Sequence, residues 1–217
     1  MSQDMVTLLI KSLGETVYMV TVSMVIASVV GIPLGVLLVT TAKNQILACI
    51  GFNRVLASVV NAVRSVPFII LMVAIIPVTR LIVGTSIGTM AAMVPLTIAA
   101  IPFIGRQVET SLKEVDAGVV EAAMAMGATP MQIIWNVLLP EAISGIIAQL
   151  TTVVIGLVGS SAMAGAIGGG GLGDLAIRYG YQRFRADVML ATVIVLIILV
   201  QVVQFAGNYV AKRLNKK

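Results

Sequence analysis

Two residue types that build many active sites are absent or almost absent from this sequence. The 217 residues include no histidine and a single cysteine, Cys49. Histidine is the most common metal ligand and a frequent general base, so its absence excludes histidine-based catalysis and histidine-ligated metals. One cysteine cannot form an intramolecular disulfide or a cysteine-rich metal site. Enzymes and metalloproteins that depend on these groups are therefore excluded.

Charge is also scarce. Charged residues make up 11% of the chain, whereas about a quarter is usual in a soluble domain. Hydrophobic residues make up 59%, and the mean hydropathy is +1.08. So many apolar residues cannot all be hidden in one water-soluble core, and the sequence predicts a membrane protein. The net charge of +5 comes from scattered or terminal basic residues, which indicates membrane orientation rather than nucleic-acid binding.

Five apolar stretches reach the length of about 20 residues that a helix needs to cross a hydrocarbon core of roughly 30 Å. They cover residues 17–40, 59–79, 81–105, 142–167 and 188–211. The second stretch contains Arg64, which is expected to lie at its inner end as a snorkelling anchor, with a role in positioning a partner left open. The first is too long for the apolar part of a signal peptide. We therefore expect an all-α, polytopic membrane protein with five transmembrane helices in a single domain over residues 1–217.

Five spans place the two termini on opposite sides of the membrane. With the N-terminus outside, nine basic residues lie inside: Lys43, Arg54, Arg64, Arg106, Lys113, Lys212, Arg213, Lys216 and Lys217. Five lie outside: Lys11, Arg80, Arg178, Arg183 and Arg185. Because cytoplasmic loops carry an excess of Lys and Arg, the count favours a periplasmic N-terminus and a cytoplasmic C-terminus. The segment 106–141 is then a cytoplasmic loop.

Within that loop, residues 121–142 read EAAMAMGATPMQIIWNVLLPEA and carry several helix boundary signals. Asp116 is suited to cap a helix over 117–126, and Gly127 to end it in a left-handed conformation. Thr129, Pro130 and Gln132 fit the N-cap, the first helical position and the third position of a capping box. Pro140 is expected to end this second helix or to begin the next. The pattern predicts helix, tight turn, helix, with several apolar side chains that suit either the bundle or a partner's groove.

The same segment resembles the EAA loop of ABC importer permeases. Glu121-Ala122-Ala123 is followed by Gly127 after three residues, and later by Val137 and Leu139-Pro140. The family usually has isoleucine at the position of Val137. The stretches RSVPFIIL (64–71), IVGTSIG (82–88), AMGATPMQI (125–133), SAMAGAIGGGGLG (161–173) and QFAGNYV (204–210) extend the resemblance to the membrane subunits of methionine importers.

This resemblance implies a type I ABC importer permease fold and the import of methionine, D- or L-, across the bacterial inner membrane. It implies a homodimer of permeases, two ATP-hydrolysing subunits and an external substrate-binding lipoprotein, all at the lipid membrane. The chain itself would then be no enzyme and would hold no cofactor or metal, because Mg-ATP is bound by the partner. The coupling helix would comprise Glu121, Ala122, Ala123, Ala125, Met126, Gly127, Thr129, Pro130, Leu139 and Pro140.

Other interpretations compete with this one. A permease for another small amino acid or a related compound is the nearest alternative. An ion-coupled transporter usually keeps ionisable residues near the membrane midplane, and no Asp, Glu or Lys lies deep in an expected span. A structural scaffold would not need a partner-docking loop. The GxxxG pairs at 31/35, 84/88 and 165/169 indicate packing within the chain or, with about half that weight, a dimer face.

The fourth span offers a candidate translocation pathway. At 100° per residue, Thr152, Gly156, Gly159 and Met163 fall within about 60° on one helical face, and Ser160 borders it. This stripe could form the wall of a pathway for a zwitterionic amino acid, with Met163 as a gate. Close helix packing is the competing interpretation and has nearly equal weight. Because the stripe carries no charge, tight binding within the membrane is not expected.

Overall fold

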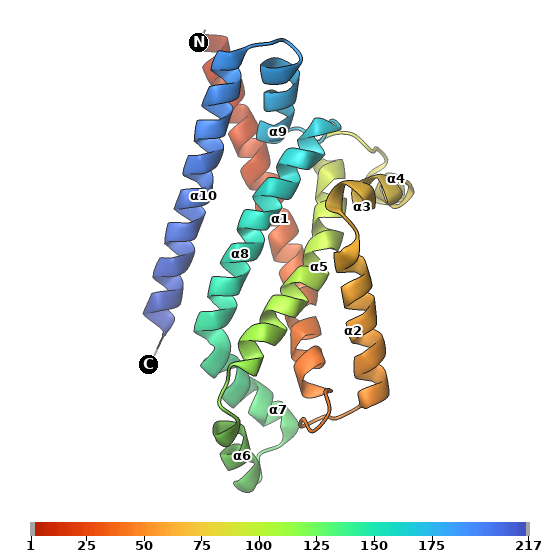
Figure 1. Cartoon of the computed structure of the whole chain (residues 1–217), viewed down its shortest axis with the longest axis vertical. Coiled ribbons are helices and arrows are strands. Elements are labelled where there is room, and N and C mark those ends of the chain that lie inside the picture. Colours follow the sequence, from red (N-terminus) through yellow and green to blue (C-terminus); the bar gives the residue numbers. More distant parts are fainter. Residues whose placement is uncertain (1–2, 216–217) are drawn as a thin grey trace. The chain divides into compact units, whose positions relative to one another are not determined.

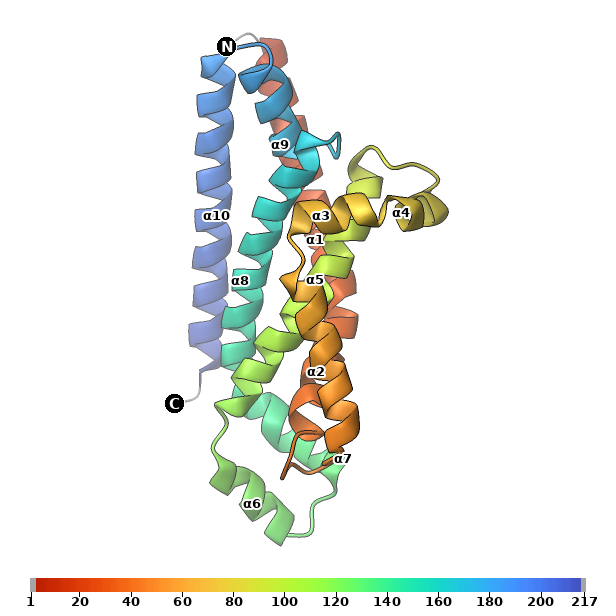
Figure 2. The same cartoon turned by 45° about the vertical axis from the view of Figure 1, so that its right-hand side comes forward.

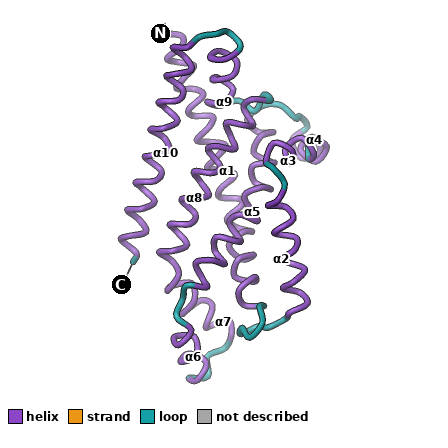
Figure 3. Tube along the Cα trace, viewed as in Figure 1, coloured by secondary structure: helices purple, strands orange, loops and turns teal. Residues whose placement is uncertain are grey.

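The computed structural model describes residues 3–215, and every regular element between them is a helix (Figure 3). In chain order these are α1 (Gln3–Thr40), α2 (Ile50–Ser65), α3 (Phe68–Ala74), α4 (Ile76–Val83), α5 (Thr89–Lys113), α6 (Ala117–Ala125), α7 (Pro130–Ile133), the π-helix η1 (Ile134–Leu138), α8 (Leu139–Ala166), α9 (Gly171–Leu175), the π-helix η2 (Ala176–Tyr181) and α10 (Ala186–Leu214). The all-α prediction is confirmed for this part of the chain.

Several of these helices are long and apolar enough to cross a membrane. Among the described residues there are four such stretches, and up to five if α2 and α3 together count as one broken span. The four are Asp4–Thr40, Thr89–Lys113, Pro130–Ala166 and Ala186–Leu214. The expected spans 17–40, 142–167 and 188–211 fall on α1, α8 and α10. The helix α1 starts much earlier than expected, at Gln3.

The second and third expected spans, 59–79 and 81–105, are wrong as continuous helices. The helix α2 ends at Ser65, and Pro67 caps α3 with an extended ψ of 136°. This break follows from the steric restriction that a proline places on the residue before it. Gly84 then ends α4 with a φ of 80°, and Gly88 has a φ of 98° before α5 begins at Thr89. The GxxxG spacing at 84/88 therefore belongs to a turn rather than to a helix interface.

The chain divides into two compact units, and the first comprises the described residues up to 27, 66–100 and 154–204. In this unit α9 lies beside α1 (Figure 1). The backbone N–H groups of Gly171 and Leu172 donate to Glu15 Oε2 at 2.8 Å and to Thr16 Oγ1 at 2.9 Å. The first N–H groups of a helix have no partner within the helix, and these bonds satisfy two of them at the start of α9.

The second unit comprises residues 28–65 and 101–153 and the described residues from 205 onward. Here α1 packs against α5 through glycines. A Cβ built on Gly35 would lie 2.6 Å from the carbonyl oxygen of Gly105, and one on Gly31 would lie 2.7 Å from Ile104 Cβ. Such distances leave no room for a side chain. The GxxxG pair at 31/35 therefore serves packing within the chain, which confirms the favoured interpretation for this pair.

Pro140 is the second residue of α8, but the chain does not leave the helical conformation before it. Residues Ile134–Leu138 form a π-helix that joins α7 to α8, so the helical stretch runs from Pro130 to Ala166. A proline removes one backbone donor and its ring clashes with the carbonyl four residues earlier. The wider π turn accommodates both effects. The expected loop 106–141 is correspondingly shorter, because residues 106–113 belong to α5.

Candidate coupling and translocation sites

The helix α6 is drawn in Figure 2, between α5 and α7 along the chain. Local hydrogen bonds fix both of its ends, from Asp116 to Gly127. Asp116 Oδ1 accepts from the N–H of Gly118 at 2.7 Å, as an N-cap does. At the other end Gly127 has a φ of 81°, and its N–H donates to the carbonyl of Met124 at 2.9 Å. The N–H of Ala128 donates to the carbonyl of Ala123 at 3.1 Å. This pair of bonds is a Schellman motif, and both predicted boundaries of α6 are confirmed to within one residue.

The start of α7 is equally well specified. Thr129 Oγ1 accepts from the N–H of Gln132 at 3.4 Å, and Gln132 Oε1 accepts from the N–H of Thr129 at 2.8 Å. Pro130 occupies the first helical position, where its missing donor costs nothing. The predicted capping box is therefore confirmed. Helix, tight turn and helix follow one another as the sequence indicates.

The apolar side chains of this segment divide into two groups. Ala123, Ile133, Ile134 and Leu138 are buried within the unit. Met126 is 83% exposed, Trp135 64% and Met131 62%. Large exposed apolar side chains on a segment of this kind are suited to contact another protein. Methionine adapts well to irregular partner surfaces.

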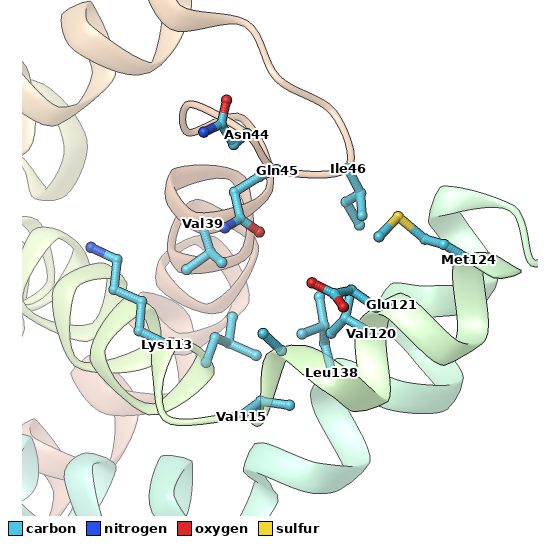
Figure 4. A pocket seen from close by; sticks show the side chains of 12 residues that line it. Val39, Asn44, Gln45, Ile46, Lys113, Val115, Val120, Glu121, Met124 and Leu138 are labelled. Carbon is cyan, nitrogen blue, oxygen red and sulfur yellow. The ribbon is translucent and has the colours of Figure 1, made fainter.

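A cavity of about 300 Å³ lies beside α6 (Figure 4). It is lined by the loop after α1, by the end of α5 and by α6 itself. Figure 4 shows the Glu121 carboxylate directed into this space, opposite Gln45 and Ile46. Lys113 also lines the cavity, but its Nζ donates to Glu109 Oε1 at 2.7 Å. The exposed carboxylate of Glu121 is thus available to a group from outside the chain.

The candidate pathway residues all lie on α8, and each is described within its own unit. In the second unit Thr152 is exposed, and its hydroxyl donates to the carbonyl of Ala148 at 3.3 Å. In the first unit Gly156, Gly159 and Met163 are exposed, while Ser160 is half-buried. A Cβ built on either glycine would meet no described atom within 4 Å. Neither glycine is required for packing within the described part of the chain.

Sequence reasoning missed a polar cluster in the second unit. Arg106 pairs with Glu109 through Nη1 and donates to Asn61 Oδ1 through Nη2 at 3.2 Å. Glu109 is only 5% exposed and also binds Lys113. The helix α5 continues to Lys113 instead of ending at residue 105, so it includes Glu109 four residues before its end. The spacing of three and four residues between these charges is the signal that could have revealed the cluster.

The position of Arg64 also differs from expectation. It was expected at the inner end of a span that begins near residue 59. The helix α2 begins at Ile50 and ends at Ser65, so Arg64 lies in its last turn. A rise of about 1.5 Å per residue places Arg64 about 21 Å along the helix. Its role as an anchor at the membrane surface stays a prediction, because the candidate span formed by α2 and α3 is bent beside it.

The family model of binding-protein-dependent transport system inner membrane components matches residues 31–216. The chain belongs to this family. A probable D-methionine transport system permease protein MetI of Vibrio cholerae is 54% identical over 210 residues, which cover 97% of this chain and 93% of the relative. The D-methionine transport system permease protein MetI of Escherichia coli K12 is 52% identical over 165 residues, 76% of each chain.

Solved structures show the same similarity. A chain in the inward-facing MetNI methionine ABC transporter is 49% identical, with a TM-score of 0.98 and complete coverage of both chains. A chain of an amino acid ABC transporter crystallised with histidines is 18% identical and shares the fold, with a TM-score of 0.79. The predicted family and the type I ABC importer permease fold are confirmed. The chain is a multi-pass component of an inner membrane transport system and not an enzyme.

Proposed function

We propose that this chain is the transmembrane subunit of an ATP-driven importer that carries methionine across the inner membrane. The observation that carries the proposal is the 54% identity to a D-methionine transport permease over 97% of the chain. The 0.98 TM-score to a chain of a methionine ABC transporter supports it independently. Both similarities extend over nearly the whole length, so they include the helices as well as the EAA loop.

In this proposal α6 and the following turn form the coupling helix. The exposed side chains of Met126, Met131 and Trp135 would enter a groove on an ATPase subunit. Glu121 would pair with a basic group of that subunit at the cavity beside α6. Because caps at Asp116 and Thr129 hold both helices, a movement of the ATPase would be passed on without unfolding the turn.

The proposed assembly contains a second copy of this chain, two ATPase subunits and an external substrate-binding lipoprotein, all in or at the lipid membrane. Mg-ATP would be bound by the ATPase subunits, and this chain would hold no cofactor. Energy would therefore reach this subunit only through the coupling helix.

We propose further that Thr152, Gly156, Gly159, Ser160 and Met163 line the pathway. The exposure of Thr152, Gly156, Gly159 and Met163 within the single chain supports this role, since a pathway wall must not be covered by its own subunit. The open space beside Gly156 and Gly159 is consistent with passage of a solute. Met163 would act as a flexible gate.

The proposed orientation has a periplasmic N-terminus and a cytoplasmic C-terminus. It follows from the nine-to-five count of basic residues, of which Lys216 and Lys217 lie outside the described residues. A cysteine added after Lys217, with Cys49 replaced by serine, should resist a membrane-impermeant thiol reagent in intact spheroplasts. Permeabilised spheroplasts supply the positive control. Labelling in intact spheroplasts would reverse the orientation and remove the coupling role of α6.

The function itself is tested by uptake. The chain is co-expressed with its ATPase, purified, and reconstituted with the external binding protein in proteoliposomes. Radiolabelled D- and L-methionine should accumulate only with ATP and the binding protein present. Competition by other amino acids measures the specificity. Accumulation of another amino acid in preference to methionine would assign the permease to a different substrate.

A further inference from the structure

Arg64 lies at the break between two apolar helices. The helices α2 and α3 are together long and apolar enough to form one span, which is bent by 99° at this break. Arg64 is the last residue but one of α2, and its guanidinium faces Phe103 on α5, a second helix long enough to cross a membrane. A cation between two candidate spans is expected within the membrane rather than at its surface.

The surroundings of Arg64 hold it in place but leave its charge uncompensated. The guanidinium carbon lies 5.1 Å from the centroid of the Phe103 ring, which orients the group through a cation–π contact. Its Nε is buried and has no hydrogen-bond acceptor among the described residues. Arg64 also takes part in none of the ion pairs formed between residues 3 and 215.

The neighbouring charges on α5 show the contrast. Arg106, one turn beyond Phe103, pairs with Glu109 and Asn61. Glu109 is already occupied by Arg106 and Lys113, so it leaves no carboxylate for Arg64. Cations in membrane-spanning segments are costly and are usually retained for a substrate or ion pathway. A guanidinium is suited to a carboxylate because its donors match the two oxygens.

We propose that Arg64 is a binding point in the translocation pathway for the carboxylate of the amino acid that this permease transports. The inference rests on the proposed function and adds an intramembrane site to it. The amino acid carboxylate would balance the guanidinium charge, which no carboxylate among the described residues pairs. The stripe on α8 carries no charge, so Arg64 would add a charged group to the proposed pathway.

The first test is transport by variants of the full complex with the ATPase and the binding protein. Arg64→Gln should lower methionine uptake by at least about tenfold, because it removes a charge-assisted bidentate interaction. Arg64→Lys should retain part of the uptake, since it keeps the charge without the planar fork. The matched control is Arg54→Gln, which removes an exposed charge near the other end of α2 and should stay within about twofold. The yield of the assembled complex should be the same for all three variants, and basal ATP hydrolysis should be unchanged in the Arg54→Gln control.

The second test reports the charge without depending on transport. Ser65→Cys places a thiol on the exposed residue next to Arg64, in a chain whose Cys49 is replaced by serine. A small anionic thiosulfonate should react faster than a cationic one of the same size, and Arg64→Gln should lower this ratio by about tenfold. Methionine should slow the reaction when Arg64 is present, and methioninol, which lacks the carboxylate, should not.

The phosphate of a phospholipid headgroup could bind the same guanidinium. The measurements are therefore made in nanodiscs of zwitterionic lipid and of anionic lipid. If methionine protects the thiol at position 65 in both lipids, the proposal is supported. If the preference for the anionic reagent disappears only in anionic lipid, Arg64 binds a lipid headgroup instead. If the unchanged complex imports methionine and Arg64→Gln imports it equally well, the inference is wrong and the proposed function stands. If the unchanged complex imports no methionine, the proposed function itself is wrong.

Discussion

Gly35 and Gly127 show two different reasons for a glycine in the same chain. Gly35 lies inside α1, where any residue can adopt the backbone conformation, but a Cβ there would lie 2.6 Å from Gly105 O and from Val108 Cβ. Gly127 has a φ of 81°, which L side chains rarely adopt, and a Cβ there would meet no described atom within 4 Å. Gly35 is required because there is no space for a side chain, and Gly127 is required because other residues rarely adopt its backbone conformation. Substitutions can separate the two requirements.

The largest effect is expected at Gly35. Gly35→Ala should destabilise the purified complex by about 1–3 kcal/mol, because the new methyl group forces α1 away from α5. The measurement is the midpoint of thermal aggregation, followed by size-exclusion chromatography. Gly14→Ala is the control on the same helix, since a Cβ there meets no described atom within 4 Å. That control should be neutral or slightly stabilising, because alanine favours helix more than glycine by up to about 1 kcal/mol. Equal behaviour of the two variants would contradict the observed packing of α1 on α5.

The next effect is expected at Gly127. Gly127→Val should leave the permease folded but cost about 1–3 kcal/mol at the turn, because a β-branched residue is strained at positive φ. Because the strain is confined to the turn, uptake should fall by more than about tenfold while the isolated permease still purifies as a folded protein. Gly127→Asn should retain most of the activity, since asparagine tolerates the left-handed region.

Glu121→Lys tests the same segment without backbone strain. It reverses the charge beside the cavity and should weaken binding of the ATPase subunit, measured by co-purification. Normal transport by both Gly127→Val and Glu121→Lys would remove the coupling role from this segment.

The contrast between these glycines also explains how far the sequence could predict the structure. The caps at Asp116 and Thr129 and the left-handed residue at Gly127 depend on neighbours within five residues, so their residue types alone identify them. The contact of Gly35 with Gly105 joins positions seventy residues apart, and a GxxxG pattern cannot say which helix it meets. The break at Pro67 could have been predicted from the proline. The long apolar run after Pro67 concealed the break, because the expected span was extended across it.

The candidate sites divide in the same way. The EAA segment is recognised from its spacing, since its helix boundaries are local. The Arg106–Glu109–Lys113 cluster was missed because an apolar stretch was taken to end where its first charge appears, although the helix continues. The place of Arg64 in the last turn of α2 was missed for a related reason, since α2 begins nine residues before the expected start at residue 59.

A smaller effect is expected at the N-cap of α7. Thr129→Ala removes the oxygen that accepts from the N–H of Gln132 and should cost about 0.5–2 kcal/mol of local stability. Hydrogen exchange of the amides at residues 131 and 132 should become faster, while exchange in α6 stays the same. Thr129→Ser keeps the oxygen and is the control. Unchanged exchange in the alanine variant would show that a partner or the remaining Gln132 bond, rather than the cap, holds this turn.

Gly156 and Gly159 represent a third case, and the smallest effect is expected beside them. They lie inside α8 with no positive φ, and a Cβ at either would meet no described atom within 4 Å, so the described chain requires neither glycine for itself. The face is then free either to border a solute pathway or to pack against a second copy of the chain, as small residues commonly do in membranes.

Cysteines at Ser160 and Met163, introduced with Cys49 replaced by serine, distinguish these two roles because only a pathway admits water. Both should react with a small hydrophilic thiol reagent, at rates that change by about twofold to tenfold when ATP is trapped in the complex, since trapping shifts the population between two pathway conformations. A cysteine at Leu157, which is 4% exposed on the same helix, should stay unreactive in every state. If the Ser160 and Met163 thiols are also silent in every nucleotide state of a transporting complex, the face belongs to helix packing, and the pathway must follow other residues such as Arg64.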